Sequence, residues 1–457
     1  GSSPLELQVP VHRDSLLQAP ILHSQLQNQL FYQVKNRFIK HSYVALKAPA
    51  NEVPELSTYP IAKYHCLEGD KFTFLNMEKE FAGWNFIDNG MLWAFNQNYF
   101  DWINEEGFPV KEGCKWIDLF IKELPKNIVG LDTYPIALRC VNWVKFFCRY
   151  PESATKQRID CLYSQLILLE KKLEYHLLGN HLLEDAFSLF IGASFFNDER
   201  LFKRAEKLLV EQLKEQVLPD GANYEQSPMY HCILLDRLLD CINIHRTDEL
   251  VIYAQQMLGH LESIMWADGT IPMLNDSANG IAPSSKQLFD YASRLDLQWK
   301  SKTLKECGYR KMKGNSLEAI VDIGNVMAPY QPSHTHADTF SYELRIEGKP
   351  FVVDTGISTY NKTERRQYER STKAHNTISV QGKDSSEVWA GFRVARQCKV
   401  NVLCDKVNYI EASHNGFKKS CKRTFIVERD IFIVEDYYDG EALSYIHLAP
   451  GVNPKRI

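Results

Sequence analysis

The chain has 457 residues, which is enough for two or three domains. Apolar residues make up 44% and charged residues 24% of the sequence, as in an ordinary globular protein. The formal net charge of −4 excludes a global basic field of the kind that recruits nucleic acid, but it allows a local basic groove for an acidic sugar. No apolar run is long enough to span a membrane.

The 11 cysteines form neither a CxxC pair nor the spacing of a zinc finger. This scattered set predicts buried free thiols rather than a disulfide framework, which favours a reducing compartment such as the cytoplasm. No signal peptide is visible. The opening Gly1-Ser2-Ser3 resembles a cloning remnant, however, so the sequence is also compatible with a native leader peptide.

Residues 1–75 are predicted to form an irregular lead-in, because short apolar pieces alternate there with prolines. Residues 76–312 have a helical pattern. The segment 134–150 carries apolar residues at spacings of three and four, and similar segments follow at 156–178, 181–196, 199–216, 227–244, 248–266 and 284–306. Asn197-Asp198 is a predicted helix cap. Helices with short connections predict stacked hairpins in a toroid or a solenoid. An (α/α) toroid and a solenoid both satisfy this pattern, and no strict repeat favours the solenoid.

In residues 313–457 the hydrophobic period changes from 3.6 to 2. Phe340, Tyr342, Leu344 and Ile346 alternate with polar residues, and a turn at 347–349 leads into a further apolar strand. More strands are predicted at 377–380, 424–428 and 431–436. The pattern predicts an antiparallel β-sandwich, so the chain is a multidomain α+β protein. We expect the sandwich to be incomplete in this chain, because the sequence stops soon after a strand-like piece at 444–450.

The first group of candidate functional residues is Asn180, His181 and Glu184. On a helix these side chains are three and four positions apart, so they share one face. A simpler interpretation is that Asn180 caps the helix and that His181 is exposed in its first turn.

The second group lies in residues 220–231. Asp220-Gly221 indicates a turn, and Ser227 before Pro228 is a typical helix start. Tyr230 then falls in the first helical turn, at the mouth of a helical barrel. The alternative is a buried Tyr230–His231 pair with satisfied hydrogen bonds.

The third group is His334, His336 and Asp338, whose side chains point the same way in an extended strand. Asp354 closes the next predicted strand and His375 opens another. Two histidines and one aspartate from three neighbouring strands, namely His336, Asp354 and His375, form a plausible zinc site. The alternative is a pair of solvated loop histidines.

The fourth group is basic and aromatic and lies in residues 370–396. Arg370, Lys373, Arg393 and Arg396 can bind carboxylate or sulfate groups, and Trp389 stands among them. An ordinary charged surface is the alternative, and we prefer it for Lys373 and Arg396.

Together these pieces resemble the heparinase II/III family of polysaccharide lyases, over residues 80 to 440. The resemblance is carried by NHLLEDA (180–186), DGANYEQSPMYH (220–231), NDSANG (275–280), HTHADTFSYELRIEGKPFVVDTG (334–356) and RSTKAHNTISVQGKDSSEVW (370–389). Their order and spacing agree with the family pattern, which is more specific than any single piece. The family combines an (α/α) toroid with a C-terminal β-sandwich.

The resemblance implies a catalytic role for five residues. Tyr230 matches the catalytic tyrosine, and His334 matches the second catalytic histidine. Asn180 and His181 match the pair that neutralises the substrate carboxylate, and Glu184 matches the acidic residue beside that pair.

The resemblance also implies a metal and a set of substrate contacts. His336, Asp354 and His375 match the residues that hold a structural zinc in several members. Thr335 departs from the family pattern, which often has glycine between the two histidines. We expect the substrate to be bound by residues in or just after these motifs: Glu225, Gln226, Arg370, Trp389 and Arg393.

The expected function is therefore β-elimination of a uronic-acid-containing polysaccharide, glycosaminoglycan-like or capsular, to give 4,5-unsaturated products. The partner is an acidic polysaccharide, and the family usually works in the bacterial periplasm. The alternatives are a glycoside hydrolase using Glu184, Glu225 or Asp236, a carbohydrate-binding protein without catalysis, and a zinc hydrolase. Nothing in the sequence indicates an oligomeric state.

Overall fold

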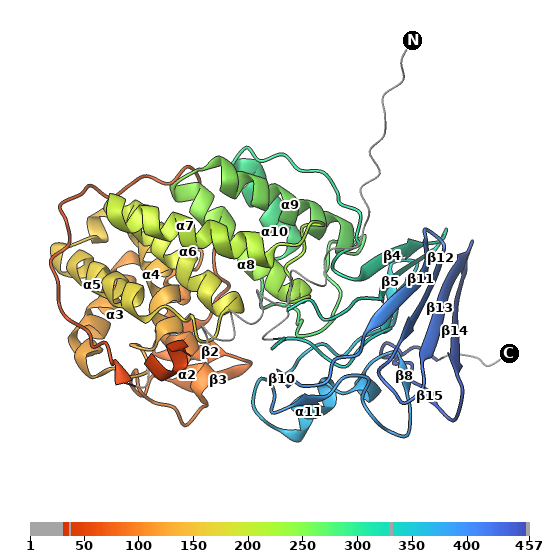
Figure 1. Cartoon of the computed structure of the whole chain (residues 1–457). Helices are drawn as coiled ribbons and strands as arrows, with labels where there is room; N and C mark the ends of the chain where they lie inside the picture. The colour runs from red at the N-terminus through yellow and green to blue at the C-terminus, as the bar shows by residue number, and fades with distance from the viewer. Residues whose placement is uncertain (1–30, 36–37, 329–331, 454–457) are drawn as a thin grey trace, which may run out of the picture.

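A computed structural model describes residues 31–35, 38–328 and 332–453 of the chain. A helical region, which runs from orange to green in Figure 1, lies beside a β region in blue. Of the predicted lead-in, residues 31–35 and 38 are helical, residues 39–66 form no helix and no strand, and residues 1–30, 36 and 37 lie outside the described residues. Next in the chain is a small antiparallel sheet, β1 (Leu67–Glu68), β2 (Lys71–Phe74) and β3 (Met77–Glu80). The sequence pattern did not reveal this sheet, because only β2 alternates between exposed and buried residues.

The helical region follows the predicted pattern in most places. Its helices are α2 (Met91–Tyr99), α3 (Val110–Glu123), α4 (Thr133–Arg149), α5 (Lys156–Lys172), α6 (Gly179–Phe196), α7 (Glu199–Gln216), α8 (Pro228–Ile244), α9 (Asp248–Ile264) and α10 (Ser285–Arg294). Two predicted helices were too long, because α5 ends at Lys172 and α10 ends at Arg294. The predicted cap is confirmed, since the Asp198 carboxylate accepts a hydrogen bond from the Leu201 N–H.

Differences in burial explain why these helices form a double layer. Nearly every residue of α4 and α6 is buried, whereas α7 is buried along one stripe and charged along the other. Helix α4 packs on α6, and α6 packs on α8, so these three lie inside. Helices α5, α7 and α9 follow them in hairpins. The pairing α4/α5, α6/α7 and α8/α9 is the (α/α) toroid predicted from the sequence (Figure 1).

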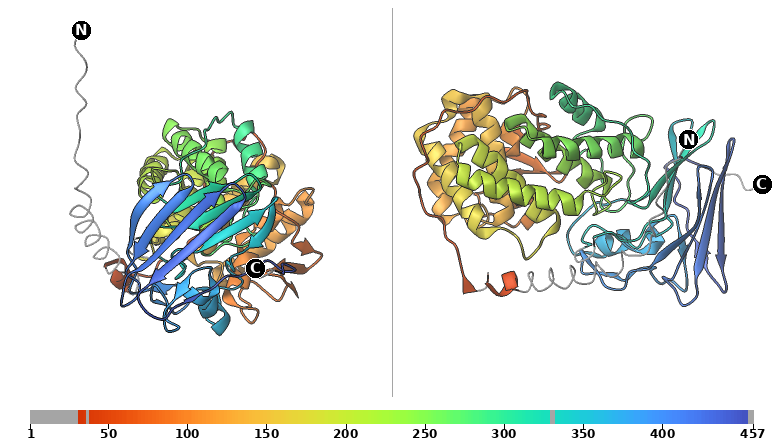
Figure 2. Two further views of the ribbon diagram at one scale, coloured as in Figure 1. Left: turned by 90° about the vertical axis from the view of Figure 1, so that its right-hand side faces the viewer. Right: turned by 45° about the horizontal axis from the view of Figure 1, so that its top comes forward.

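The β region is a sandwich of two four-stranded antiparallel sheets. One sheet has the order β4 (Tyr309–Lys313), β5 (Leu317–Asp322), β6 (Tyr342–Ile346) and β7 (Lys349–Val352). The other has the order β11 (Val400–Lys406), β12 (Tyr409–His414), β13 (Cys421–Glu428) and β14 (Ile431–Tyr438). Val321 and Leu344 of the first sheet share one apolar core with Ile410 and Phe425 of the second. In the left panel of Figure 2 the sandwich is seen face-on, with the helical region behind it.

In Figure 1 the chain between β7 and β11 lies at the lower end of the sandwich, and its α11 and β10 extend toward the helical region. It contains α11 (Glu364–Glu369), the 3-10 turn η4 (Thr372–Ala374) and three short strands, β8 (Ile378–Ser379), β9 (Val388–Trp389) and β10 (Arg393–Val394). Strand β9 pairs with β10, and β8 pairs with β15 (Leu443–Ser444).

One prediction about the β region was wrong. Residues 334–338 do not form a strand, but lie in a turn-rich loop between β5 and β6. Asp354 lies just after β7, and His375 lies between η4 and β8. The alternation of side chains along a strand therefore cannot explain how these residues are oriented.

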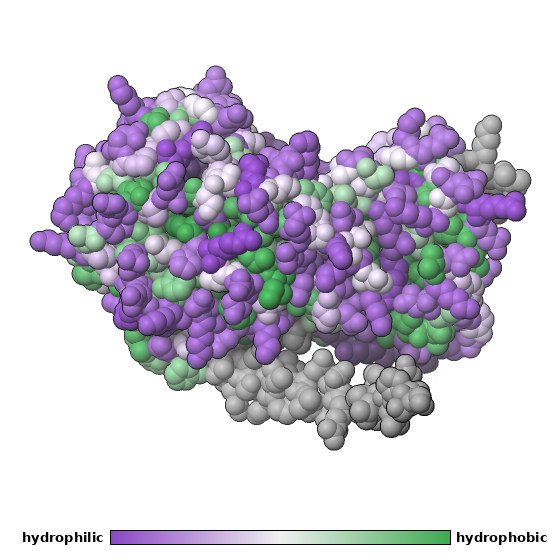
Figure 3. All heavy atoms as spheres, turned by 90° about the horizontal axis from the view of Figure 1, so that it is seen from above, coloured by the Kyte–Doolittle hydropathy of each residue, from purple (hydrophilic) through white to green (hydrophobic). Residues whose placement is uncertain are grey.

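The two regions are joined by a third apolar core and by polar contacts. Ala222, Trp266 and Leu304 pack there with Tyr309 and Ile320 at the start of the sandwich. Seen from above, the outline of the molecule narrows between the two regions, and hydrophilic side chains prevail on that face (Figure 3). None of the helices in the described ranges is long and apolar enough to cross a membrane.

Arg423 in β13 provides a test of this architecture. Its guanidinium is 1% exposed, binds both oxygens of Asp436, and donates to the carbonyls of Phe340 and Asn376. Arg423→Met leaves these acceptors unpaired, so it should lower the free energy of unfolding by ~3–5 kcal/mol in urea denaturation. Lys419→Met removes an exposed ion pair with Asp439 and serves as the control. Equal denaturation midpoints for the two variants would contradict this account.

Candidate active site

The buried carboxylate of Asp276 organises one wall of the candidate site. It accepts hydrogen bonds from His334 Nδ1 at 2.9 Å and from His336 Nε2 at 2.7 Å, and the Arg366 guanidinium of α11 binds both of its oxygens. Burial acts to raise the pKa of Asp276, but the two histidines and Arg366 hold it far below its ordinary value. An ionised carboxylate can only accept hydrogen bonds, so the protons lie on His334 Nδ1 and His336 Nε2.

Tyr230 packs directly against His334. The two rings are stacked with their centroids 3.8 Å apart and an interplanar angle of 29°. Tyr230 lies in the first turn of α8, where the Ser227 hydroxyl accepts the Tyr230 N–H and donates to the main-chain carbonyl of Asp276. The helix start predicted at Ser227-Pro228 is thus confirmed. Because Asp276 holds the histidine and its main chain holds the cap, the two rings are fixed relative to each other.

The protonation state of Tyr230 differs from the expectation for a tyrosine base. Burial raises the pKa of Tyr230, and this effect outweighs the lowering by the hydrogen bond to Tyr360 and by Arg366. The Tyr230 and Tyr360 hydroxyl oxygens are 2.9 Å apart. In the unliganded protein the Tyr230 hydroxyl is therefore protonated and able to donate.

Glu225 connects His334, which stacks on Tyr230, to Asn180 at the start of α6. Its Oε1 accepts the main-chain N–H of Asn180 at 3.0 Å, and its Oε2 lies 3.3 Å from His334 Nε2. A Cβ at Gly179 would lie 2.7 Å from Glu225 Oε1, so glycine at that position allows the carboxylate to approach. The residues expected to be catalytic, Asn180, Tyr230 and His334, thus belong to one network of contacts.

His181 lies beside this network. Its Nδ1 is 2.9 Å from Glu174, and its ring packs on Tyr134 with the centroids 4.8 Å apart. Burial lowers the pKa of His181, but Glu174 raises it more, so the charged form is favoured. The His181 side chain is 37% exposed and can be reached by a ligand. Asn180 does not cap α6, because the helix already begins at Gly179.

Glu184 lies one turn further along α6 and is 1% exposed. Its Oε2 is 3.5 Å from Arg237 Nε. Burial raises the pKa of Glu184 to about 7, and Arg237 opposes the shift while Asp236 and Asp240 add to it. Glu184 therefore lies in the charged interior of the toroid rather than on an open surface.

The five residues expected to bind substrate occupy different environments. Gln226 is buried, donates to the carbonyls of Cys307 and Asn325, and accepts the Met327 N–H, so it fastens the loop before α8 to the β region. Arg370 is fully buried and donates to the main-chain carbonyls of Thr335 and Trp389. All the polar groups of Gln226 are occupied, and Arg370 is inaccessible, so their positions do not fit the expected substrate contacts.

Trp389 and Arg393 are exposed at the edge of the same region. Trp389 is 46% exposed, and the Arg393 guanidinium carbon lies 5.1 Å from the centroid of its ring. Their β9–β10 hairpin presents both an aromatic face and a positive charge to solvent. These two residues remain available for a ligand, whereas Glu225 is buried and already engaged with Asn180 and His334.

The expected metal residues meet in the loop region behind His334. The His336 and His375 rings have their centroids 5.2 Å apart, and His375 Nδ1 is 2.9 Å from Asp354. His336 Nδ1 and His375 Nε2 are buried and have no hydrogen-bond partner within the described residues. Asp338 Oδ2 is unpartnered too, and burial raises the pKa of this carboxyl to about 6. These residue types suit zinc, but the ligand atoms of His336, Asp354 and His375 do not all lie within 4.8 Å of one another here. Burial acts to lower the pKa of His375, but Asp354 raises it to about 9, which favours the protonated ring in the absence of a metal.

Four residues of the network were not singled out from the sequence. Asp276 belongs to the NDSANG piece, which supported the resemblance but received no role. Glu174, Tyr360 and Arg366 lie in segments without a recognised motif. Arg366 sits between Glu364 and Glu369 on a short helix, where an arginine is usually read as a solvated surface residue.

Two family models match the chain. "Heparinase II/III N-terminus" matches residues 160–299, and "Heparinase II/III-like, C-terminal" matches residues 297–457. Together they cover well over half of the sequence. The chain therefore belongs to the heparinase II/III-like family, as the motifs indicated.

Two heparin-sulfate lyases are similar to this chain in sequence. The protein from Pedobacter heparinus is 25% identical over 303 residues, which cover 58% of this chain and 45% of the relative. The protein from Bacteroides thetaiotaomicron is 21% identical, over 59% of this chain and 46% of the relative. The chain spans about half the length of the curated relatives it matches.

Solved structures agree with the fold. A heparinase III gene product has a TM-score of 0.54 and 16% sequence identity, over 78% of this chain and 66% of that chain. A variant of the heparan sulfate lyase from Pedobacter heparinus has a TM-score of 0.51 and 16% identity, over 91% of this chain and 74% of that chain.

Glu184→Gln should stabilise the protein in a pH-dependent manner. The pKa of the Glu184 carboxyl is raised from 4.5 to about 7, so keeping it ionised in the folded state costs free energy. The cost is absent below about pH 4.5, where the folded and unfolded states are both protonated, and it grows as the pH rises through about 7. The melting temperature of Glu184→Gln relative to the parent should therefore rise between about pH 5 and about pH 8.

Glu262→Gln is the matched control, because Glu262 is exposed on α9. Its melting temperature relative to the parent should be the same at both pH values. A Glu184→Gln effect that does not change with pH would contradict the role given to burial.

Proposed function

We propose that this protein is a lyase that cleaves a uronic-acid-containing glycosaminoglycan by β-elimination. The observation that carries the proposal is the stacked Tyr230–His334 pair, held by Asp276 on one side and joined through Glu225 to Asn180 on the other. It places a protonated hydroxyl and an imidazole with a fixed tautomer beside a pair of residues that can bind a carboxylate. The names of the heparin-sulfate lyase relatives support the substrate class.

The first requirement of the reaction is to stabilise the negative charge that develops when the substrate loses its C5 proton. A uronic acid carries a weakly acidic proton at C5, next to its carboxylate, and removing this proton places further negative charge on an anionic group. Hydrogen bonds that strengthen as this charge develops lower the barrier. The Asn180 amide and the charged form of His181, favoured by Glu174, are the donors we assign to this task.

The two proton transfers then divide between the stacked rings. Asp276 keeps the proton on His334 Nδ1, so His334 Nε2 can accept the C5 proton. The raised pKa of Tyr230 suits the opposite task, donation of its hydroxyl proton to the departing O4. Electrons from the C5–H bond form the C4–C5 double bond while the C4–O4 bond breaks, and the new non-reducing end is 4,5-unsaturated.

A glycoside hydrolase is less compatible with this geometry. It would need two carboxyl groups on opposite sides of the scissile bond. Glu184, Glu225 and Asp236 are all less than a tenth exposed. Glu184 and Asp236 both face Arg237, and Glu225 is engaged with Asn180 and His334.

Tyr230→Phe tests the proposed acid. It removes one hydroxyl and keeps the ring stacked on His334, so the fold and substrate binding should persist. Turnover should fall by the ~10²–10⁴-fold that a general acid contributes. The measurement is the ultraviolet absorbance of unsaturated products from heparan sulfate, heparin, chondroitin sulfate, hyaluronan and alginate. Tyr342→Phe, which changes a buried tyrosine in the sandwich, is the control and should keep parental turnover.

Asn180→Ala tests the carboxylate-binding pair in the same assay. It removes the side-chain amide but keeps the main-chain N–H that holds Glu225. Loss of a donor to a developing oxyanion costs about 3–4 kcal/mol of barrier, so turnover should fall by ~10²–10³-fold. Saturated product ends that incorporate solvent oxygen would refute the lyase. An absence of any product, with the polymer still bound, would favour a binding protein.

We also propose a structural zinc held by His336, Asp354 and His375. When bound, the ion would supply a fixed positive charge behind the loop that carries His334. The chain's own part is to present buried ring nitrogens that lack other partners. Burial lowers the pKa of His336 to about 4, so its ring is neutral and able to bind a metal.

Metal analysis tests this site independently of activity. His336→Ala, purified without chelators, should contain one equivalent of zinc less than the parent and should melt at a lower temperature. His414→Ala, which removes a buried histidine elsewhere in the sandwich, controls for loss of packing. An unchanged zinc content in His336→Ala would show that the three residues form only a hydrogen-bonded cluster.

A further inference from the structure

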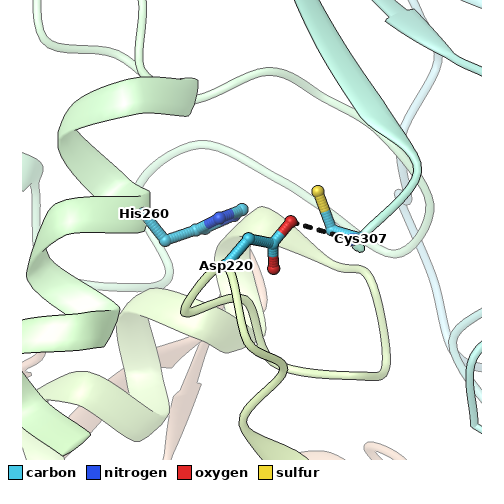
Figure 4. Close-up of side chains that lie close together, drawn as sticks. All are labelled: Asp220, His260 and Cys307. Carbon is cyan, nitrogen blue, oxygen red and sulfur yellow. Dashed lines mark hydrogen bonds between the residues drawn. The ribbon is translucent and has the colours of Figure 1, made fainter. Parts of the chain in front are cut away.

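A second group of potential metal ligands lies at the junction of the helical and β regions. Asp220, His260 and Cys307 each offer a ligand atom, and these atoms lie within 4.8 Å of one another. In Figure 4 the three side chains converge from the loop before α8, from α9 and from the segment before β4. Their exposures are 5%, 4% and 0%. The elimination reaction proposed above uses none of the three.

The Asp220 carboxylate is ionised, although it is buried. Its Oδ2 accepts the main-chain N–H groups of Lys305 at 3.0 Å and Cys307 at 2.9 Å. Burial acts to raise the pKa of Asp220, but these hydrogen bonds and His260 lower it below its ordinary value. Asp220 has no lysine or arginine ion-pair partner among the residues that the structure describes. The carboxylate is thus a buried negative charge without a countercharge, which is an expensive arrangement in a protein interior.

One ring nitrogen of His260 is left without a hydrogen-bond partner among the described residues. Burial lowers the pKa of His260 to about 4, so the ring is neutral. The ring is hydrogen-bonded to the main chain of Asp220, whereas Nδ1 is buried with no hydrogen-bond partner within the described residues. A neutral imidazole that donates through one nitrogen has a lone pair on the other, and this lone pair is what a metal ion requires.

We propose that Asp220, His260 and Cys307 bind a divalent transition-metal ion, best zinc, in a structural site that fastens the loop before α8 to α9 and to the first strand of the sandwich. Sulfur, nitrogen and oxygen donors together are typical of zinc. The charges support this choice, because a thiolate, a carboxylate and a neutral imidazole around a divalent cation sum to zero.

Metal binding at this site would displace the proton of the Cys307 thiol. Burial raises the pKa of the Cys307 thiol, so the thiol is protonated without metal. When the sulfur–metal bond forms, the S–H bond breaks and the proton leaves to solvent, with no change in oxidation state. The site lies in the third apolar core, next to Ala222 and Tyr309. The loop that carries Asp220 continues to Glu225 and Ser227. A bound ion would therefore restrain the start of the loop that positions these two residues.

Cobalt spectroscopy distinguishes this site from the zinc site near His334. The metal-stripped full chain is titrated with Co²⁺ alone, and the near-ultraviolet spectrum is followed for a thiolate-to-cobalt charge-transfer band. The parent should show the band at one equivalent per chain. His336→Ala should keep it, because the set with Asp354 and His375 contains no sulfur. Success or failure here is independent of whether the protein is a lyase.

Two variants each remove one proposed ligand, and a third variant controls for the loss of packing. Cys307→Ser and His260→Gln should both lose the band, and both should lose the rise in melting temperature that Zn²⁺ gives the parent. Cys232→Ser changes an equally buried cysteine in α8 and should keep both signals. Circular dichroism verifies that each variant is folded. Absence of the band in the folded parent would overturn the proposal whatever the variants do. So would a band that persists in Cys307→Ser.

Discussion

The candidate site depends on one buried interaction, the carboxylate of Asp276 with Arg366 and two histidines. An isolated carboxylate in the interior would be protonated or would destabilise the fold. Here the guanidinium and two imidazole N–H groups compensate its charge. Because the carboxylate is thereby ionised, it fixes the tautomers of both histidines. His334 is left with an unprotonated Nε2 that lies 3.3 Å from Glu225, and His336 is left with an Nδ1 that has no hydrogen-bond partner within the described residues.

Asp276 therefore links two functions that the sequence motifs treat separately. His334 faces Tyr230 and Glu225, while His336 faces His375. A metal at His336 would act on His334, the base proposed here, through Asp276 and the short loop 334–336, without touching the substrate. This arrangement explains in physical terms how a structural ion could influence catalysis: it would restrain the carboxylate that positions His334.

The sequence predicted those features that depend on local chemistry. The hydrophobic periods revealed the toroid and the sandwich, and the caps at Asp198 and Ser227 formed because Asp and Ser accept N–H groups at helix starts. The role of Asp276 could not be predicted this way, because its partners His334 and Arg366 are 58 and 90 residues away. No periodicity relates positions at that separation.

Burial of polar residues was the other point that the sequence could not resolve. Gln226 and Arg370 are residue types that often bind sugars. In the fold, however, both side chains are buried and donate their hydrogen bonds to main-chain carbonyls. The loop 334–338 was predicted as a strand because its residues alternate, whereas its main chain is held by contacts such as the His336 N–H with Asn275. Patterns reveal which residues are polar, and only the fold reveals which polar groups are already satisfied.

The charges of the site impose a last constraint on how an acidic polymer can bind. Each of three carboxylates already has a cationic partner: Glu174 with His181, Glu184 with Arg237, and Asp276 with Arg366. A substrate carboxylate therefore adds a negative charge to a site whose cationic side chains His181, Arg237 and Arg366 are already paired. Burial has brought the pKa of Glu184 to about 7, so this side chain can take up a proton at neutral pH at little cost. Proton uptake there would remove one of the negative charges around Arg237, which Asp236 and Asp240 also contact, and would offset the charge that the substrate brings.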